Sequence, residues 1–388
     1  MRDFVSKAAK NIKPSGIRKF FDIVAEMDDA ISLGVGEPDF VTPWGIRQAG
    51  IQSIRKGFTQ YTSNKGMPEL RSRISEYLKA RFSVDYAPQN IVVTVGASEA
   101  IDLSLRATCN PGDEILVPDP CYVSYAPSVE LCGGVPVSIQ CTAENAFKLT
   151  PEMIEAVITP KTKAIIFPYP TNPTGGIMER EYLEAIVPVI EKHDLLVISD
   201  EIYAELTYGG QHVSIASLPG MKERTVLING FSKAFAMTGW RIGYVAGPTD
   251  VLNAILKIHQ YCIMCANTAS QHAALYALEE GFQDGFQSVN EMREEYDKRR
   301  RFMVKSLNDL GLTCFEPKGA FYVFPSVAST GMSGEEFAEK LLLTERVAVV
   351  PGSAFGESAK NHVRCSYASS MKNLTEAIER IARFLKTL

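Results

Sequence analysis

Residues 195–203, with the sequence LLVISDEIY, decide the fold. They form an apolar run that ends in an acid, and such a run without polar alternation is typical of a strand covered on both faces. Runs of the same kind predict strands at 91–95, 114–117, 135–139, 164–167, 226–229 and 242–246. Amphipathic stretches predict helices between or after them at 98–109, 179–193 and 251–265. The alternation predicts an α/β domain with a mostly parallel sheet flanked by helices.

The two ends of the chain follow a different pattern. Residues 1–40 predict a weak helix and an extended glycine-rich stretch, and a long charged helix is predicted over 284–310. After it come predicted helices and strands at 320–324, 334–343, 346–350, 362–365 and 374–385. We therefore predict a large α/β domain over 41–283 and a smaller α+β domain formed by 1–40 and 284–388.

Composition narrows the class of function. The 388 residues carry a net charge of −5, so no broad basic field exists to attract nucleic acid or anionic lipid. No apolar run approaches the length of about 18 residues that crosses a bilayer, and the N-terminal residues lack the apolar region of a signal peptide. Eight scattered cysteines indicate a reducing compartment rather than a disulfide framework. We expect a cytoplasmic enzyme that acts on small molecules.

Two loops after predicted strands carry candidate binding groups. The turn Gly96-Ala97-Ser98 opens a helix, and its amides with the Ser98 hydroxyl suit an anion such as phosphate. An ordinary turn capped by Ser98 is the alternative. In residues 169–176, YPTNPTGG, prolines fix the chain around Asn172, whose amide is then free to donate to a ligand oxygen. A plain tight turn is the alternative there.

Charged side chains follow two further strands. Asp200 closes the central strand and is expected to face the crevice at the strand ends, with Tyr203 one helical turn on. An N-cap aspartate is the alternative. Lys233 follows a strand in apolar company, where desolvation lowers the pKa of an amine and makes it nucleophilic. Arg241 lies in an equally apolar stretch and needs an anionic partner, either a ligand or a structural ion pair.

The order of these segments identifies a family. The chain resembles the class I aminotransferases of the pyridoxal 5'-phosphate-dependent, fold-type-I superfamily over nearly its whole length. The resemblance rests on GVGEPDF at 34–40, NPTG at 172–175, DEIY at 200–203, the lysine segment at 230–243 and VRCS at 363–366. It implies the fold of that superfamily and an aminotransferase with pyridoxal 5'-phosphate as its cofactor.

The resemblance also implies catalytic roles. Lys233 is implied to bond to the cofactor's aldehyde and, once displaced by substrate, to move the proton between the substrate Cα and the cofactor. Asp200 is implied to keep the pyridine nitrogen protonated, so that the ring accepts electrons from the Cα. Tyr203 and Asn172 are implied to donate to the phenolic oxygen of the ring, and Tyr122 to stack on the ring.

Phosphate and substrate contacts follow from the same resemblance. The phosphate is implied to contact Gly96, Ala97, Ser98, Ser232 and Arg241. This chain has Gly230 where many relatives carry a serine that contacts the phosphate. Tyr61 is implied to reach the phosphate in the partner subunit of a homodimer with shared sites. Arg364 is implied to grip the substrate carboxylate. The further substrate contacts are implied to be Gly36, Tyr122, Asn172 and Ile17.

One segment offers a competing metal site. His259, Cys262, Cys265 and His272 are residue types that zinc accepts as ligands. The segment predicts a helix with both cysteines on one face, but the histidines are spread along the chain and no turn brings them together. We therefore predict no metal site and no redox-active cysteine pair there.

Transamination is the leading functional hypothesis. The amino group of an L-amino acid would pass to a 2-oxo acid such as 2-oxoglutarate by a ping-pong mechanism, with aspartate, aromatic or broad donor specificity. The apolar segment around Ile17 favours hydrophobic donors. A lyase on the same fold, such as a carbon–sulfur β-lyase, is the alternative because it begins with the same Cα deprotonation. A non-enzymatic regulator is a third, although the family pattern begins too early to leave room for an N-terminal DNA-binding domain.

Overall fold

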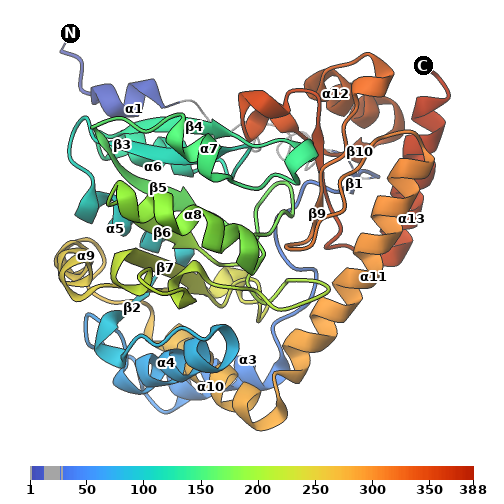
Figure 1. Ribbon diagram of the computed structural model, residues 1–388. Helices are drawn as coiled ribbons and strands as arrows, with labels where there is room; N and C mark the ends of the chain where they lie inside the picture. The colour runs from blue at the N-terminus through green and yellow to red at the C-terminus, as the bar shows by residue number, and fades with distance from the viewer. Residues whose placement is uncertain (1, 13–26, 28) are drawn as a thin grey trace.

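The computed structural model describes residues 2–12, 27 and 29–388 (Figure 1). Its centre is a seven-stranded sheet in the order β2-β8-β7-β6-β5-β3-β4. Neighbouring strands run parallel except β8, which is antiparallel to both β2 and β7. The α/β fold with a mostly parallel sheet is thus confirmed. The strands are β2 (Ile91–Thr94), β3 (Glu114–Asp119), β4 (Val135–Gln140), β5 (Thr162–Phe167), β6 (Leu196–Asp200), β7 (Thr225–Gly230) and β8 (Gly243–Ala246).

Helices cover both faces of this sheet, which explains the unbroken apolar runs in the sequence. On β5, Ile166 packs with α5, α6 and α9, whereas its neighbour Ile165 packs with α7 and α8. A further cluster joins α3, α4 and α10 to the β2 edge. These helices are α3 (Trp44–Arg55), α4 (Pro68–Phe82), α5 (Gly96–Thr108), α6 (Tyr125–Leu131), α7 (Pro151–Glu155), α8 (Arg180–Lys192), α9 (Thr249–Cys262) and α10 (Thr268–Asp284).

The C-terminal elements lie to one side of the sheet (orange to red in Figure 1). Three strands form an antiparallel sheet in the order β11-β12-β9, while β10 pairs in parallel with β1 from the N-terminal region. The N-terminal α1 contacts α6 instead. The bounds are α1 (Lys7–Asn11), β1 (Ile31–Ser32), α11 (Gln287–Asp309), β9 (Tyr322–Val323), α12 (Gly334–Glu345), β10 (Val347–Ala348), β11 (Val350–Pro351), β12 (Val363–Ser366) and α13 (Met371–Leu385).

The prediction of one strand over 346–350 is wrong. The stretch holds two short strands, because β10 pairs with β1 and β11 pairs with β12. The buried residue Val349 lies between them, where the chain passes from one partner to the other. Arg346 directly precedes β10, and the other four residues are apolar. The sequence therefore does not show where one strand ends and the next begins.

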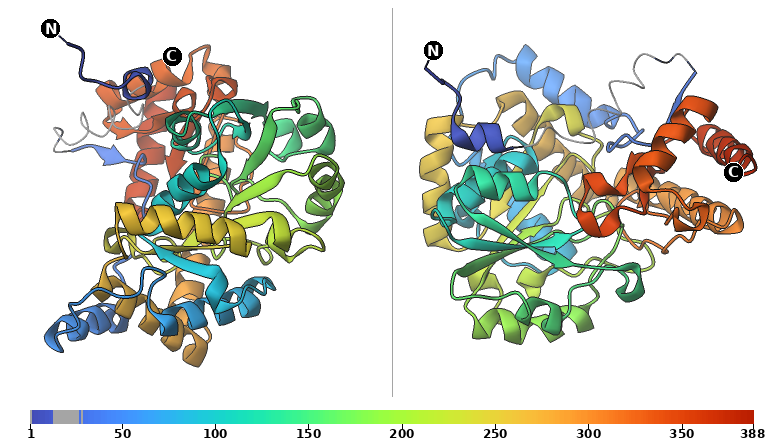
Figure 2. Two further views of the ribbon diagram at one scale, coloured as in Figure 1. Left: turned by 90° about the vertical axis from the view of Figure 1, so that its left-hand side faces the viewer. Right: turned by 90° about the horizontal axis from the view of Figure 1, so that it is seen from above.

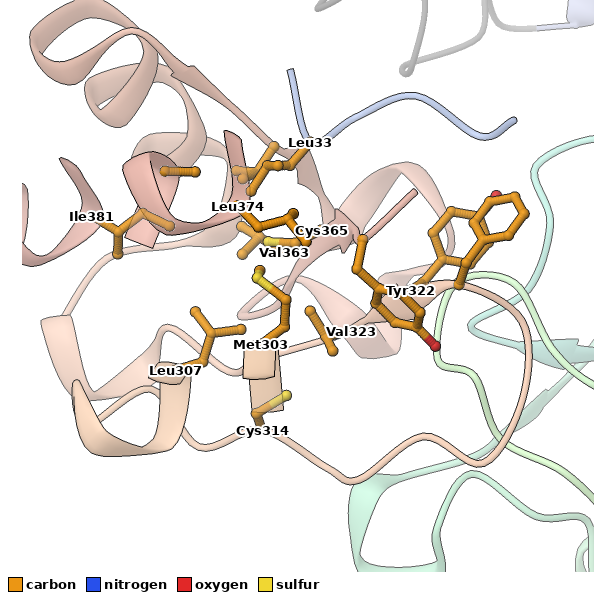
Figure 3. Packing of buried hydrophobic residues seen from close by; sticks show 14 of the residues in the cluster. Leu33, Met303, Leu307, Cys314, Tyr322, Val323, Val363, Cys365, Leu374 and Ile381 are labelled. Carbon is orange, nitrogen blue, oxygen red and sulfur yellow. The ribbon is translucent and has the colours of Figure 1, made fainter. Parts of the chain in front are cut away.

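A hydrophobic core inside the C-terminal part includes a residue from the N-terminal region (Figure 3). Leu33 is fully buried in this core together with Val363 of β12 and Leu374 of α13. Its N–H donates to the Ala348 carbonyl, so side chain and backbone both fix the segment. Tyr322 of β9 stands at the edge of the core with its hydroxyl pointing away from the cluster.

The strand order brings many loops to one edge of the sheet. The residues that follow parallel strands emerge at the same edge, where ligands bind in such folds. Because β8 runs the opposite way, this edge also receives the residues that precede it, and Gly243 at its start pairs with Gly230 of β7. A Cβ on Gly243 would lie 2.8 Å from the carbonyl carbon of Gly96 and 2.9 Å from the Ala97 nitrogen, so this close approach requires glycine.

Leu374→Ala is expected to lower the free energy of unfolding by about 2–5 kcal/mol, because the change leaves a cavity in the core of Figure 3. Leu343→Ala on α12 is the control, because that side chain is 59% exposed and its loss is expected to cost less than about 0.5 kcal/mol. Urea unfolding followed by circular dichroism measures both. Equal effects of the two changes would contradict the burial of Leu374.

Candidate active site

A cavity of about 750 Å³ opens at this edge of the sheet. It brings together most of the residues predicted from the sequence, namely Gly36, Ala97, Ser98, Tyr122, Asn172, Asp200, Tyr203, Ser232, Lys233, Arg241 and Arg364. Gly96 directly precedes Ala97 at the start of α5. Tyr61 does not line the cavity, since it lies on the loop after α3 with a side chain that is 80% exposed. Ile17 lies outside the described residues.

Lys233 follows β7 and reaches across the cavity to the N-terminal segment. Its Nζ donates to the Gly36 carbonyl at 2.6 Å. Burial lowers the pKa of this amine to about 8; the guanidinium groups of Arg364 and Arg241 act in the same direction, and the Glu37 carboxylate opposes them. A lower pKa leaves more of the amine neutral, which is the nucleophilic form.

Asp200 ends β6 as a buried carboxylate. The Tyr125 hydroxyl donates to its Oδ2 at 2.8 Å, and the Ile202 N–H donates to its Oδ1 at 3.2 Å. Burial raises the pKa of Asp200 to about 6, although both hydrogen bonds favour the ionised form. Such a carboxylate is stabilised by a cation placed against it.

Tyr125 was not predicted as a site residue. It lies at the start of α6, three residues after Tyr122, and the two rings meet edge to face with centroids 5.6 Å apart. The only sequence signal is that spacing of three, which places both side chains near the same helix end.

The start of α5 forms a cradle for an anion. Gly96 has a φ of +75°, and a Cβ there would lie 2.6 Å from Nη2 of Arg241. The Arg241 guanidinium thus lies directly against the first turn of α5, and its Nη1 donates to the Thr238 carbonyl at 2.9 Å. The first amides of a helix have no partner within it, so they and the guanidinium together suit a phosphate.

Arg364 on β12 is a buried cation. Its Nη1 donates to Oδ1 of Asn172 at 2.9 Å and its Nη2 to the Gly34 carbonyl at 2.6 Å. Within the described residues its Nε is buried without a hydrogen-bond partner, and the oxygens that accept from its other two nitrogens are neutral. Because Asn172 Oδ1 accepts from the guanidinium, the amide nitrogen of Asn172 is left to donate elsewhere.

Two tyrosine hydroxyls meet on the side of the cavity formed by the C-terminal part. The hydroxyls of Tyr203 and Tyr322 lie 2.9 Å apart. Burial raises the pKa of Tyr203 well above its ordinary value, so this phenol stays neutral and able to donate. Tyr322 was missed because the predicted strand over 320–324 gave no reason to single out one aromatic side chain in it.

The suggested zinc ligands lie apart from this cavity. His259 contacts Glu99, and the His272 ring stacks on Phe58 with centroids 5.1 Å apart. In the part of the chain that the structure describes, no three metal-binding side chains converge.

Comparisons with known proteins identify the family. The family model for aminotransferase class I and II matches residues 28–381. The chain belongs to this family. It is 54% identical over 386 residues to the Bacillus subtilis protein YugH, which is named as an aminotransferase without a stated substrate, and the match covers 99% of each chain. It is 46% identical over 377 residues to an aspartate aminotransferase of Pyrococcus abyssi, covering 97% of this chain and 96% of that one.

A solved structure confirms the fold at a high level of similarity. The aromatic aminotransferase from Pyrococcus horikoshii OT3 superposes with a TM-score of 0.90 at 44% identity. The match covers 96% of this chain and 99% of the other. The chain is therefore a pyridoxal 5'-phosphate-dependent aminotransferase, as expected from the sequence.

The residues of the cavity fit the chemical groups of this cofactor. The cradle at Gly96 and Arg241 suits its phosphate, and the amine of Lys233 suits its aldehyde. The buried Asp200 suits a protonated ring nitrogen. The positive charge of Arg364, whose Nε has no partner among the described residues, suits a carboxylate of the substrate.

Glu37→Gln is expected to lower the pKa of Lys233 below its value of about 8, because the carboxylate that raises this pKa is removed. The pH midpoint for the rate at which the apoenzyme takes up pyridoxal 5'-phosphate should therefore move to lower pH. Stopped-flow absorbance measures this rate.

The control for this prediction separates charge from hydrogen bonding. Thr238 Oγ1 donates to Oε2 of Glu37 at 3.0 Å, so Thr238→Val removes that bond and keeps the carboxylate. The pH midpoint for cofactor uptake by Thr238→Val is expected to equal that of the wild type. A Glu37→Gln midpoint at or above the wild-type value would contradict the electrostatic account.

Proposed function

We propose that this aminotransferase passes the amino group of an L-amino acid to a 2-oxo acid such as 2-oxoglutarate by a ping-pong mechanism, with aromatic, hydrophobic or broad donor specificity. The observation that carries the proposal is the buried guanidinium of Arg364 in the same cavity as the amine of Lys233. A planar cation beside a nucleophilic amine suits α-amino and 2-oxo acids. The names of the relatives, which include aspartate and aromatic aminotransferases, support donors of both kinds.

When bound, the cofactor supplies an aldehyde that takes up the amino group and a ring that accepts electrons from the substrate Cα. We assign to Lys233 the attachment of the cofactor and the transfer of the proton at the substrate Cα, because its lowered pKa lets it both accept and release a proton near neutral pH. Asp200 holds a proton on the ring nitrogen, and Tyr125 orients its carboxylate by a hydrogen bond.

We assign the remaining contacts from the family resemblance, and the cavity supports them because most of these residues line it. Tyr203 and the amide nitrogen of Asn172 would donate to the phenolic oxygen of the bound cofactor, and Tyr122 would stack on its ring. Arg364 binds the substrate carboxylate beside Gly36, where a Cβ would lie 3.0 Å from the Tyr322 hydroxyl. The phosphate is held by Gly96, Ala97, Ser98, Ser232 and Arg241.

Within the described residues, the cavity has no cation left over for a second carboxylate on the donor. Among the described lining residues the cations are Lys233, Arg241 and Arg364, and each already has an assigned partner. The cavity wall also holds the apolar side chains Val35, Ile101, Val123 and Ile202. Because no further cation lines the cavity among the described residues, the lining supports hydrophobic and aromatic donors more strongly than aspartate.

We propose a homodimer with shared active sites, in which Tyr61 reaches the phosphate of the other subunit. Large apolar side chains are exposed along α3 and the loop after it, at Trp44, Ile51, Ile54, Phe58 and Tyr61. A cluster of this kind on a protein surface marks a binding face. A second copy of the chain would cover it.

We further propose that residues 41–283 form the large domain and that 1–40 and 284–388 form the small one. The pairing of β1 with β10 and the burial of Leu33 support this division. A cytoplasmic location is proposed because all eight cysteines are free. Within the described residues no helix is long and apolar enough to cross a membrane.

A panel of amino donors tests the proposed reaction. Phenylalanine, tyrosine and aspartate are each mixed with 2-oxoglutarate, and glutamate is measured. Glutamate is expected with at least one donor, and faster with the aromatic donors because no further cation among the described lining residues is left for the aspartate side chain. Pyruvate and ammonia from cystathionine, with no glutamate from any donor, would favour a lyase instead. Lys233→Ala is the control, and it is expected to abolish both turnover and the visible absorption of the bound cofactor.

Subunit complementation tests the shared sites. Lys233→Ala and Tyr61→Ala chains are each expected to be nearly inactive as homodimers. Mixed after unfolding and refolding, they are expected to recover about a quarter of wild-type activity, because half of the dimers are hybrids with one intact site. Activity that stays at the level of the parent variants would contradict a site shared between subunits.

A further inference from the structure

A buried carboxylate–histidine pair lies behind the proposed phosphate site and has no role in the function described so far. His259 on α9 is fully buried, and its Nδ1 lies 2.8 Å from Oε1 of Glu99 on α5. The other oxygen of this carboxylate, Oε2, accepts the N–H of Val95 at 2.5 Å. α9, the gold helix that faces the viewer in the left panel of Figure 2, packs against α5.

Among the described residues, the ring of His259 makes its one hydrogen bond to Glu99. An ionised carboxylate only accepts hydrogen bonds, so the proton in this contact belongs to His259 Nδ1. Its Nε2 is buried and has no hydrogen-bond partner among the described residues. A buried polar ring is costly unless its contacts compensate, so this single contact is the reason for a histidine at the position.

Glu99 lies close enough to the start of α5 for its carboxylate to change the affinity for an anion bound there. It lies in the first turn of α5, directly after the amides of Gly96, Ala97 and Ser98. The helix dipole favours one negative charge there, but a second anion nearby is repelled by the first. Because Val95 and His259 occupy its two oxygens, the carboxylate is held away from those amides.

The Val95 contact also fixes the backbone that shapes the cradle. Val95 directly precedes Gly96, whose φ of +75° turns the chain into α5. No side chain caps the helix at Val95. The Glu99 carboxylate reaches back from the first turn to the N–H of the residue before the helix, as the acidic member of a capping box does, and leaves the following helix amides without a side-chain cap.

We propose that Glu99 and His259 form a positioning pair for the phosphate-binding turn. His259 holds the Glu99 carboxylate against the Val95 amide, which fixes Gly96 and leaves the following amides and Arg241 open to the phosphate. Neither residue touches the cofactor. The inference rests on the proposed phosphate site at Gly96, Ala97, Ser98 and Arg241.

The test compares the Kd of the apoenzyme for pyridoxal 5'-phosphate with its Kd for pyridoxal, which lacks the phosphate. His259→Leu removes the donor, so the Kd for pyridoxal 5'-phosphate is expected to rise about tenfold while that for pyridoxal changes less than about twofold. His259→Asn is the matched control, because its amide nitrogen replaces Nδ1 and is expected to keep the Kd within about threefold of wild type.

A double variant identifies the Glu99 charge as the cause. In Glu99→Gln/His259→Leu no carboxylate is left to reach the phosphate amides, so most of the tenfold loss is expected to disappear. If the double variant has the same Kd for pyridoxal 5'-phosphate as His259→Leu alone, the proposal is overturned. If His259→Leu does not fold, as judged by circular dichroism, Glu99→Ala decides, because it removes the oxygen that accepts the Val95 N–H. A several-fold rise in the Kd for pyridoxal 5'-phosphate with little change for pyridoxal supports the pair, and an unchanged Kd overturns it.

Arg241→Leu distinguishes failure of this inference from failure of the proposed site. If Arg241→Leu weakens pyridoxal 5'-phosphate but not pyridoxal, while His259→Leu weakens both equally, the phosphate site stands and the positioning pair is overturned. If Arg241→Leu raises the Kd for both ligands equally, the phosphate does not bind at Arg241, and both the proposed site and this inference are wrong.

Discussion

The buried charge of Arg364 is the interaction on which the rest of the site depends. The residue is 2% exposed, and the oxygens that accept from its guanidinium, on Asn172 and Gly34, are neutral. The ring centroids of Tyr322 and Phe355 lie 4.4 and 4.9 Å from Cζ of Arg364. Their attraction for a cation offsets part of the free-energy cost of burying the guanidinium. The same charge lowers the pKa of Lys233. One cation therefore favours binding of a carboxylate and increases the nucleophilicity of the amine.

Much of the fold could be predicted because its central strands are buried on both faces. Ile165 and Ile166 contact helices on opposite sides of the sheet, and only an unbroken apolar run satisfies both. Side chains that follow parallel strands meet at one edge of the sheet, so the sequence predicts that Asp200 and Lys233 lie in one crevice. The cavity contains both.

Other features of the fold and the site depend on strand pairing and on hydrogen bonds between distant residues, which a sequence pattern does not show. An antiparallel strand buried on both faces has the same composition as a parallel one, so the reversed direction of β8, which delivers Arg241 to the site edge, was not predictable. Tyr125 and Tyr322 were missed because their roles depend on hydrogen bonds to Asp200 and Tyr203 across the fold. Helices α3, α4 and α10 were not predicted, although α4 buries Leu70, Ile74 and Leu78 at the four-residue spacing typical of a helix.

Residues 33–42 connect the two halves of the molecule. Leu33 is anchored in the C-terminal core, the Gly34 and Gly36 carbonyls accept from Arg364 and Lys233, and the Thr42 hydroxyl donates to the Ala236 carbonyl. Both cations are also the ones assigned to substrate and cofactor. Binding at Lys233 therefore exchanges a contact with the Gly36 carbonyl, whereas Arg364 keeps Nε for a carboxylate while it still holds Gly34.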